Sequence, residues 1–259
     1  FCITEERTDM SFGFVTELVS EGEVQIIVPK LKAFKRTMGD YAPSRAPVFY
    51  NPLMEISRDM AILVLQAYQR SIGRGLSVSE PLAGCGVKGI RFAKEVEGIE
   101  EIHLNDINPE AFRMMKHNIQ LNELVMKISS TDEDAKLFLS HYARPKIRFD
   151  YIDIDPSGTP VPYLDSSIQA LRNGGMLALT ATDLAPLCGV YPTVALRKYG
   201  GFSLRTEYCR ELAVRLLTSC LVTTAARHNI GIRVVFSHNG SHYVRVYALA
   251  NYNAKEADN

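Results

Sequence analysis

The chain has 259 residues, which is enough for one large domain or two small ones with a substantial core. Hydrophobic residues make up 46% of the sequence and charged residues 22%, a composition that excludes extensive disorder. Lys and Arg number 29, as do Asp and Glu, so no overall positive charge points to a nucleic-acid partner, and any such binding depends on a local patch.

The first 56 residues lack the regular alternation of apolar runs and helical stretches that marks the rest of the chain. Residues 23–28 (EVQIIV) predict a strand that ends at Pro29, and a loop rich in turn formers covers residues 39–52. Between them lies a basic stretch of Lys30, Lys32, Lys35 and Arg36. This stretch is either a solvated surface or a nucleic-acid contact. We expect residues 1–56 to form a small strand and loop extension ahead of one domain, residues 57–259.

A helix is predicted from Ser57, as its N-cap, to Tyr68. Beyond it, short apolar runs alternate with helical stretches. The runs that predict strands are residues 76–80, 101–106, 149–155, 175–180, 231–237 and 243–251, and the first helices between them are 87–96 and 109–121. This alternation predicts a doubly wound α/β fold with a mostly parallel sheet and helices on both faces. The short turn at 238–241 predicts that the last two strands form an antiparallel hairpin.

The five cysteines are scattered, and no two of them form a Cys-x-x-Cys pair. This pattern argues against a disulfide framework and against structural zinc, and it favours a reducing compartment. No apolar run approaches the roughly 18–20 residues of a membrane span, and no leader of a secretory signal follows Phe1. We expect an intracellular protein, cytoplasmic or nuclear if eukaryotic, with no membrane partner and no metal.

A glycine-rich turn follows the first of the regular strands. Gly84, Gly86 and Gly89 match the pattern G-x-G-x-x-G, in which glycines let the backbone approach a ligand at the start of a helix. Asp106 ends the next strand roughly twenty residues on, where a carboxylate can accept hydrogen bonds from both hydroxyls of a ribose. The pattern indicates an adenosine site. A structural turn with Asp106 as a helix cap is the alternative.

A carboxylate also ends the strand at residues 149–155, where Asp155 is followed by Pro156. Hydride transfer has no need of this group, whereas methylation of an exocyclic amine does, because the lone pair of the amine is delocalised into its ring. Asp155 can orient the amine and take its proton, and such general-base help is typically worth about 10²–10⁴-fold. We therefore predict methyl transfer from S-adenosylmethionine; an Asx turn before Pro156 is the structural alternative.

Further motifs resemble the tRNA guanine-N2 dimethyltransferases of archaea and eukaryotes. They are PVFYNP (47–52), Arg58-Asp59, GIRF (89–92), LNDI (104–107), DIDPSG (153–158), TATD (180–183), PLCG (186–189) and LRKYG (196–200). The resemblance implies a class I, Rossmann-like sheet of seven strands that uses S-adenosylmethionine. It also implies one or two methyl transfers to N2 of a tRNA guanine, in most members guanine 26, where the D stem meets the anticodon stem.

The resemblance also implies the residues of the site. Asp155, with Pro156, would be the catalytic group, and Phe49, Tyr50 and Asn51 would meet a guanine that leaves its stack. The residues implied for the cofactor are Arg58, Gly84, Gly86, Arg91, Asp106, Asp134 and Ala135. Candidate phosphate contacts are Arg197, Lys198, Arg205, Arg210 and the basic stretch at 30–36.

Three departures from the family pattern leave alternatives open. Ser157 stands where an aromatic residue is common, Cys85 where Ser or Thr is usual, and we expect the C-terminal tRNA-binding domain of the family to be absent from this chain, which ends at Asn259. The alternatives are a paralogue that modifies another guanine or only binds tRNA, a cytosine-C5 methyltransferase with Cys188 as nucleophile, and a nicotinamide-dependent dehydrogenase. We expect a monomer that acts on tRNA.

Overall fold

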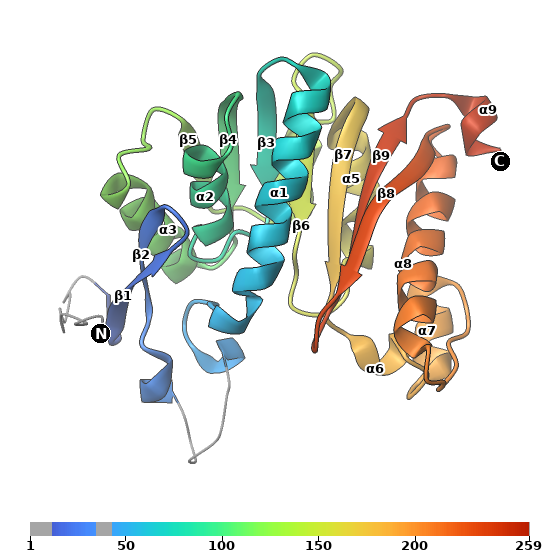
Figure 1. Ribbon diagram of the computed structural model, residues 1–259, viewed down its shortest axis with the longest axis horizontal. Helices are drawn as coiled ribbons and strands as arrows, with labels where there is room; N and C mark the ends of the chain where they lie inside the picture. Colours follow the sequence, from blue (N-terminus) through green and yellow to red (C-terminus); the bar gives the residue numbers. More distant parts are fainter. Residues whose placement is uncertain (1–11, 35–42, 259) are drawn as a thin grey trace. The chain divides into compact units, whose positions relative to one another are not determined.

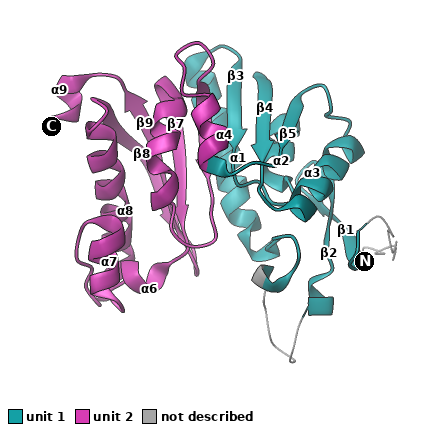
Figure 2. Ribbon diagram, turned by 180° about the vertical axis from the view of Figure 1, so that it is seen from behind, with its two compact units in different colours: residues 1–135 teal, residues 136–259 magenta. Residues whose placement is uncertain are grey.

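A computed structural model describes residues 12–34 and 43–258. The chain divides into two compact units, residues 1–135 and 136–259 (Figure 2). Figure 1 labels their helices and strands. Two basic residues of the predicted phosphate contacts, Lys35 and Arg36, lie outside the described residues. The division at residue 56, which rests on a change in the sequence pattern, stays a prediction.

The first unit contains a parallel sheet flanked by helices. Its strands lie in the order β5-β4-β3 and are β3 (Leu76–Glu80), β4 (Ile99–Asn105) and β5 (Ile128–Thr131). Its α-helices of eight or more residues are α1 (Glu55–Ile72), α2 (Val87–Glu95) and α3 (Pro109–Leu121). Helix α2 packs against β4 and α3 packs against β5. Every residue of β3 is buried, as expected for a parallel strand covered on both faces.

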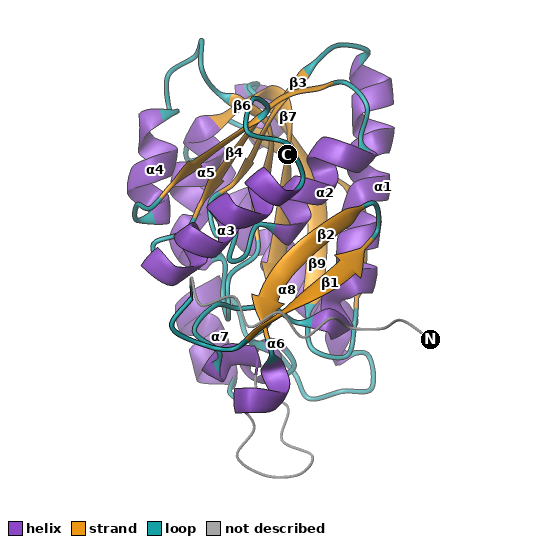
Figure 3. Ribbon diagram, turned by 90° about the vertical axis from the view of Figure 1, so that its left-hand side faces the viewer, coloured by secondary structure: helices purple, strands orange, loops and turns teal. Residues whose placement is uncertain are grey.

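An antiparallel hairpin, β1 (Thr16–Glu21) and β2 (Val24–Pro29), precedes this sheet (Figure 3). The sequence predicted only its second strand. Two amide side chains one turn apart, on α3 and directly after its last residue, bond the other edge of β2. Asn118 accepts from the N–H of Ile27 (2.7 Å) and donates to its carbonyl (3.0 Å), and Asn122 pairs with Gln25 in the same way (3.2 and 2.7 Å). These amides take the place of a third strand.

Helix α1 begins two residues earlier than predicted. A short 3₁₀ helix, η3 (Pro52–Met54), runs directly into α1 at Glu55, so Ser57 lies inside the first turn and is not the N-cap. The capping side chain is that of Asn51, which accepts a hydrogen bond from the N–H of Leu53 at the start of η3 (2.9 Å). The prediction for Ser57 was wrong because a second, shorter helix precedes the first periodic apolar residues.

The second unit contains four strands in the order β6-β7-β9-β8. They are β6 (Phe149–Ile154), β7 (Leu171–Ala181), β8 (Gly231–Asn239) and β9 (Val244–Asn251). Strands β6 and β7 pair in parallel, whereas β9 is antiparallel to both β7 and β8. The long helix α8 (Cys209–Ala226) packs against β8 and β9. The three strands of the first sheet and these four confirm the predicted mostly parallel α/β fold of seven strands with an antiparallel C-terminal hairpin.

Shorter helices complete the described parts of the chain. They are α4 (Ala135–His141), α5 (Leu164–Ala170), α6 (Leu184–Leu187), α7 (Pro192–Tyr199), α9 (Ala254–Ala257), and the 3₁₀ helices η1 (Leu31–Phe34), η2 (Pro43–Arg45) and η4 (Val161–Tyr163). Among the described residues, none of the helices is long and apolar enough to cross a membrane.

Candidate active site

The glycine-rich turn joins β3 to α2. Gly84 and Gly86 have φ angles of +56° and +82°, in the left-handed region that favours glycine. A Cβ on Gly89 would lie 2.3 Å from Cδ2 of Leu104 on β4, so this glycine lets α2 pack closely on the sheet. A Cβ on Gly84 would lie 3.3 Å from the carbonyl oxygen of Phe49. The predicted turn is therefore formed, with Gly84 and Gly86 favoured by their backbone conformation and Gly89 by close packing.

Asp106 follows β4 and is bonded to this turn. Its Oδ2 accepts a hydrogen bond from the N–H of Gly84 (2.8 Å), and its Oδ1 accepts one from the N–H of Asn108 (3.0 Å). Burial raises the pKa of the Asp106 carboxyl, and the two backbone N–H groups act against that rise. The cap of α3 is Asn108, whose side chain accepts from the N–H of Glu110 (3.0 Å). Asp106 is therefore not the cap of that helix.

The ends of the three strands of the first unit are tied together by Asn105, a fully buried residue of the LNDI motif whose role the sequence did not indicate. Its Nδ2 donates to the carbonyls of Pro81 and Glu133 (both 3.0 Å), and its Oδ1 accepts from the N–H of Glu133 (3.0 Å). Asp134, which follows, is exposed, and Ala135 is buried. The segments that carry Gly84, Asp106 and Asp134 thus meet at the carboxyl edge of these strands.

Arg58 and Arg91 share a buried carboxylate, Glu21 of β1, which no sequence pattern indicated. Arg58 donates to it through Nε (2.5 Å) and Nη2 (2.6 Å), and Arg91 through Nη1 (3.0 Å). Arg91 also bonds Glu95 (2.8 and 2.9 Å) and pairs with Asp59 (2.7 Å). Burial acts to raise the pKa of Glu21, but the two guanidinium groups outweigh it and hold that pKa below its ordinary value.

The three residues predicted to meet the substrate base differ in exposure. Tyr50 is 7% exposed, donates from its hydroxyl to Glu21 (3.1 Å), and has the guanidinium carbon of Arg58 5.3 Å from its ring centroid. Burial raises the pKa of Tyr50, with the charge of Glu21 adding to the rise. The side chain of Asn51 caps η3. Phe49, which is 48% exposed, is therefore the one of these three whose side chain is open to stacking.

In the second unit, Asp155 directly follows β6, and its side chain is 22% exposed. The loop after it is tied to the end of β7. The N–H of Gly158 donates to Oγ1 of Thr182 (2.7 Å), and the N–H of Thr182 donates to the carbonyl of Gly158 (2.8 Å). Pro156 is buried and Ser157 is exposed. The carboxylate thus stands at the end of a buried strand, on a loop that is fixed on its other side.

The predicted phosphate contacts fall into two groups. Lys198 donates to Asp183 (2.9 Å), and Arg210 bonds the carbonyls of Gly240 and Ser241. The side chains of Arg197 and Arg205 are exposed, as is that of Lys32, whereas Lys30 is half-buried. Of the four candidates in the second unit, Arg197 and Arg205 are therefore the two that are better placed to contact a phosphate group.

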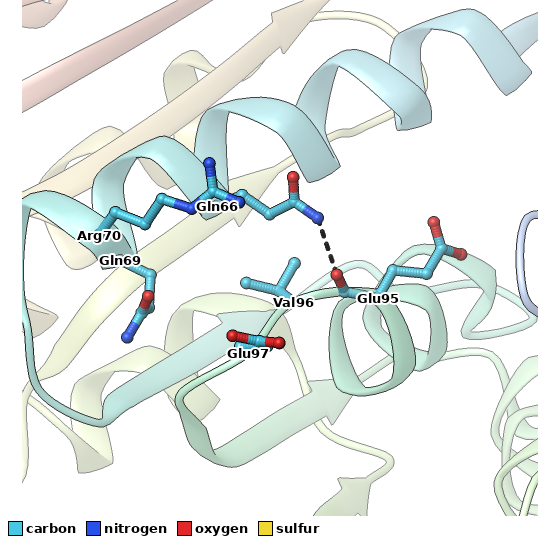
Figure 4. A pocket seen from close by; sticks show the side chains of 6 residues that line it. All are labelled: Gln66, Gln69, Arg70, Glu95, Val96 and Glu97. Carbon is cyan, nitrogen blue, oxygen red and sulfur yellow. Dashed lines mark hydrogen bonds between the residues drawn. The ribbon is translucent and has the colours of Figure 1, made fainter.

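A hollow of about 130 Å³ lies between α1 and the end of α2 (Figure 4). It is lined by Gln66, Gln69, Arg70, Glu95, Val96 and Glu97. The amide of Gln66 donates to the carbonyl of Glu95 (2.8 Å) within it. The glycine turn lies at the other end of α2, so this hollow is not part of the candidate site. In the described part of the chain, no group of His, Cys, Asp or Glu residues could hold a metal ion.

A mostly parallel set of seven strands with an antiparallel C-terminal hairpin, and a glycine turn to which Asp106 is bonded, defines a Rossmann-like protein of the class I methyltransferase type. Comparison with known proteins narrows this class. A model of the family "N2,N2-dimethylguanosine tRNA methyltransferase" matches residues 22–259, and the chain belongs to this family.

Individual relatives agree with that assignment. The chain is 42% identical over 241 residues to a tRNA (guanine(26)-N(2))-dimethyltransferase of Methanothermobacter thermautotrophicus, which covers 93% of this chain and 60% of the relative. A protein of the same name from Methanococcus maripaludis is 39% identical over 246 residues (93% and 62%). A solved complex of Trm1 from Pyrococcus horikoshii with S-adenosyl-L-methionine gives a TM-score of 0.81 at 32% identity (93% and 63%). The chain thus spans about 60% of the length of these curated relatives.

Proposed function

We propose that this chain catalyses methyl transfer from S-adenosylmethionine to N2 of a tRNA guanine, namely guanine 26 at the junction of the D and anticodon stems. The observation that carries the proposal is the family match over residues 22–259. The names of the two curated relatives support the choice of guanine 26. The glycine turn, Asp106 and Asp155 support the chemistry.

The carboxyl edge of the first unit fits the adenosine half of the cofactor. The turn at Gly84 and Gly86 brings backbone to this edge without side chains, and Asp106 offers carboxylate oxygens that can accept from ribose hydroxyls. Asp134 and Ala135 follow the third strand at the same edge. Arg58 and Arg91 are the two basic residues that we expect in the cofactor site, and both donate to Glu21. When bound, S-adenosylmethionine supplies an electrophilic methyl group.

Asp155 is the catalytic carboxylate in this proposal. It accepts a hydrogen bond from the exocyclic amine and turns the nitrogen lone pair toward the methyl carbon. As the new C–N bond forms and the C–S bond breaks, Asp155 takes the proton that the nitrogen loses. The exposed fraction of its side chain leaves it open to substrate, and the buried Pro156 together with the Gly158–Thr182 pair restricts the loop.

A stacked guanine cannot present its amine to a carboxylate, so we propose that the base is extruded from the tRNA stack. Phe49 is the residue we propose for stacking on it, a contact worth roughly 1–3 kcal/mol per base. Tyr50 is not proposed to stack on the base, because its hydroxyl donates to the buried Glu21 and its ring is buried. This assignment accommodates Ser157, which has no ring to stack. Arg197 and Arg205 are proposed as phosphate contacts.

The proposal is tested by methyl incorporation into unmodified tRNA, with the modified nucleoside mapped afterwards. Asp155→Ala and Asp155→Asn should each lower the rate by about 10²–10⁴-fold while leaving the affinity for S-adenosylmethionine unchanged. Asp165→Asn, a surface carboxylate 65% exposed in the same unit, is the control. Unchanged turnover in Asp155→Ala would refute the role of Asp155. If the wild type binds tRNA but transfers no methyl group, the result would favour the non-catalytic paralogue. If it binds a nicotinamide dinucleotide in place of S-adenosylmethionine, the result would favour the dehydrogenase.

A further inference from the structure

A fully buried arginine, Arg245 of β9, lies beside the proposed catalytic carboxylate. Three polar groups hold its guanidinium. Nε donates to the hydroxyl of Tyr247 (2.7 Å), Nη1 to the hydroxyl of Thr180, and Nη2 to the carboxylate of Asp153. A side chain fixed at all three nitrogens by β6, β7 and β9 places its positive charge at a defined point.

The register of the strands explains why this arginine meets Asp155. Ile154 of β6 pairs with Leu179 of β7, so the next residues along, Asp155 and Thr180, are level. Thr180 in turn pairs with Arg245 of β9. Asp155, Thr180 and Arg245 therefore form one row across the sheet, and Nη1 of Arg245 lies 3.9 Å from Oδ2 of Asp155.

The distance of 3.9 Å distinguishes two kinds of interaction. It exceeds hydrogen-bond length, so Arg245 attracts Asp155 without donating to it. The carboxylate that takes the hydrogen bond is Asp153, which is fully buried and also accepts from the hydroxyl of Tyr151 (3.0 Å). Asp153 thus binds the arginine through a hydrogen bond, whereas Arg245 acts on Asp155 through the attraction of its charge.

We propose that Arg245 is a positioning residue for Asp155: it draws one carboxylate oxygen toward the sheet and so directs the other to the substrate amine. This inference rests on the proposed function. Arg245 itself is fully buried and is not proposed to touch cofactor or substrate. His238 of β8 pairs with Arg245 in the register, and burial together with the charge of Arg245 lowers the pKa of His238 to about 4. His238 is therefore neutral near pH 7, and Arg245 is the cation of this row.

The experiment measures kcat and KM for tRNA in the 259-residue chain, and the affinity for S-adenosylmethionine by calorimetry. Arg245→Met should lower kcat by about 100-fold with KM and cofactor affinity changed less than about twofold. Arg245→Lys, which keeps the charge, should recover about tenfold of that loss. Thr180→Val is nearly isosteric and removes only the hydroxyl that holds Nη1, the nitrogen facing Asp155, so it should lower kcat by about tenfold.

A matched control lies on the same pair of strands. Arg172 of β7 pairs with the buried Asp150 near the start of β6 (2.8 Å), and Arg172→Met should lower thermal stability while leaving kcat unchanged. The inference is overturned if Arg245→Lys and Thr180→Val keep the wild-type kcat, or if Arg172→Met lowers kcat as much as they do. If Arg245→Met does not fold, Arg245→Lys and Thr180→Val test the inference in its place. A wild type that transfers no methyl group overturns the proposed function, and this inference with it.

Discussion

Glu21 is the residue on which the N-terminal part of the candidate site depends. It accepts hydrogen bonds from arginines 37 and 70 residues further along the chain. Removing one member of a buried ionic cluster costs about 3–5 kcal/mol, because the remaining charges lose their partner. We therefore expect Glu21→Gln to lower the free energy of unfolding by about 3 kcal/mol at pH 7, measured by urea denaturation. Glu17→Gln, half-exposed on the same strand, should change it little.

The same carboxylate gives a dependence on pH. The pKa of Glu21 in the folded protein is held below its ordinary value, so its stabilisation is fully present above the unfolded pKa and is lost as the pH falls through the folded pKa. The difference in stability between wild type and Glu21→Gln should therefore narrow as the pH is lowered below about 4. A difference that stays constant from pH 7 into that range would contradict the assignment.

Cys188 separates the proposed reaction from cytosine-C5 methylation, which needs a thiolate. Burial raises the pKa of Cys188 to about 11, and the neighbouring thiol of Cys209 adds to the rise, so Cys188 is a neutral thiol near pH 7. Reactive cysteines have lowered pKa values instead. We expect Cys188→Ser to retain methyl transfer, measured by incorporation into tRNA. A covalent adduct between the wild type and RNA that contains 5-fluorocytidine would reverse this conclusion.

At the scale of elements, α3 holds the β1–β2 hairpin and the glycine turn together. The amide of Asn118 bonds Ile27 of β2, and its Nδ2 also donates to the carbonyl of Cys85 in the turn (3.0 Å). Asn118→Asp keeps the acceptor but sets a carboxylate against two carbonyls. We expect it to lower the free energy of unfolding by about 3 kcal/mol and to weaken binding of S-adenosylmethionine, measured by denaturation and calorimetry. Asn122→Asp, one turn away, should affect stability alone; equal loss of cofactor affinity would contradict the link to the turn.

The strands differ in how far the sequence predicted them. β3 spans the residues expected, and β6 ends one residue early, because both are continuous buried runs with clear boundaries. β5 has a single buried residue, Ile128, and β1 (TELVSE) has only two apolar residues, which are adjacent, so neither strand carries a strong apolar signal. The partners of the site were hidden for another reason: Arg245 lies 92 residues from Asp153, and no local pattern records such a pairing. The glycines of the turn and the carboxylates at the strand ends could be predicted, because a few neighbouring residues in the sequence are enough to recognise each of them.

For the whole molecule, electrostatics limits how tRNA can bind. With 29 basic and 29 acidic residues, no long-range field attracts a polyanion, so affinity depends on which exposed cations lie along the bound RNA. Lys198 and Arg210 are bonded within the protein, whereas Arg197 and Arg205 are exposed. Each phosphate contact contributes about −0.7 to −0.9 to the slope of log Kobs against log salt. A protein that relies on two such contacts should therefore depend only weakly on salt.

We accordingly expect a slope of about −2 for tRNA binding by this chain, or roughly a tenfold loss of affinity between 50 and 200 mM salt. Fluorescence anisotropy with labelled tRNA measures it. Arg197→Ala and Arg205→Ala should each make the slope shallower by about one, because each removes one phosphate contact and the counterion released with it. Arg215→Ala is the control, since Arg215 is also exposed but pairs with Glu211 on α8 (2.7 Å). A steep slope that neither variant changes would assign the phosphate contacts to other residues, because the slope counts contacts wherever they lie.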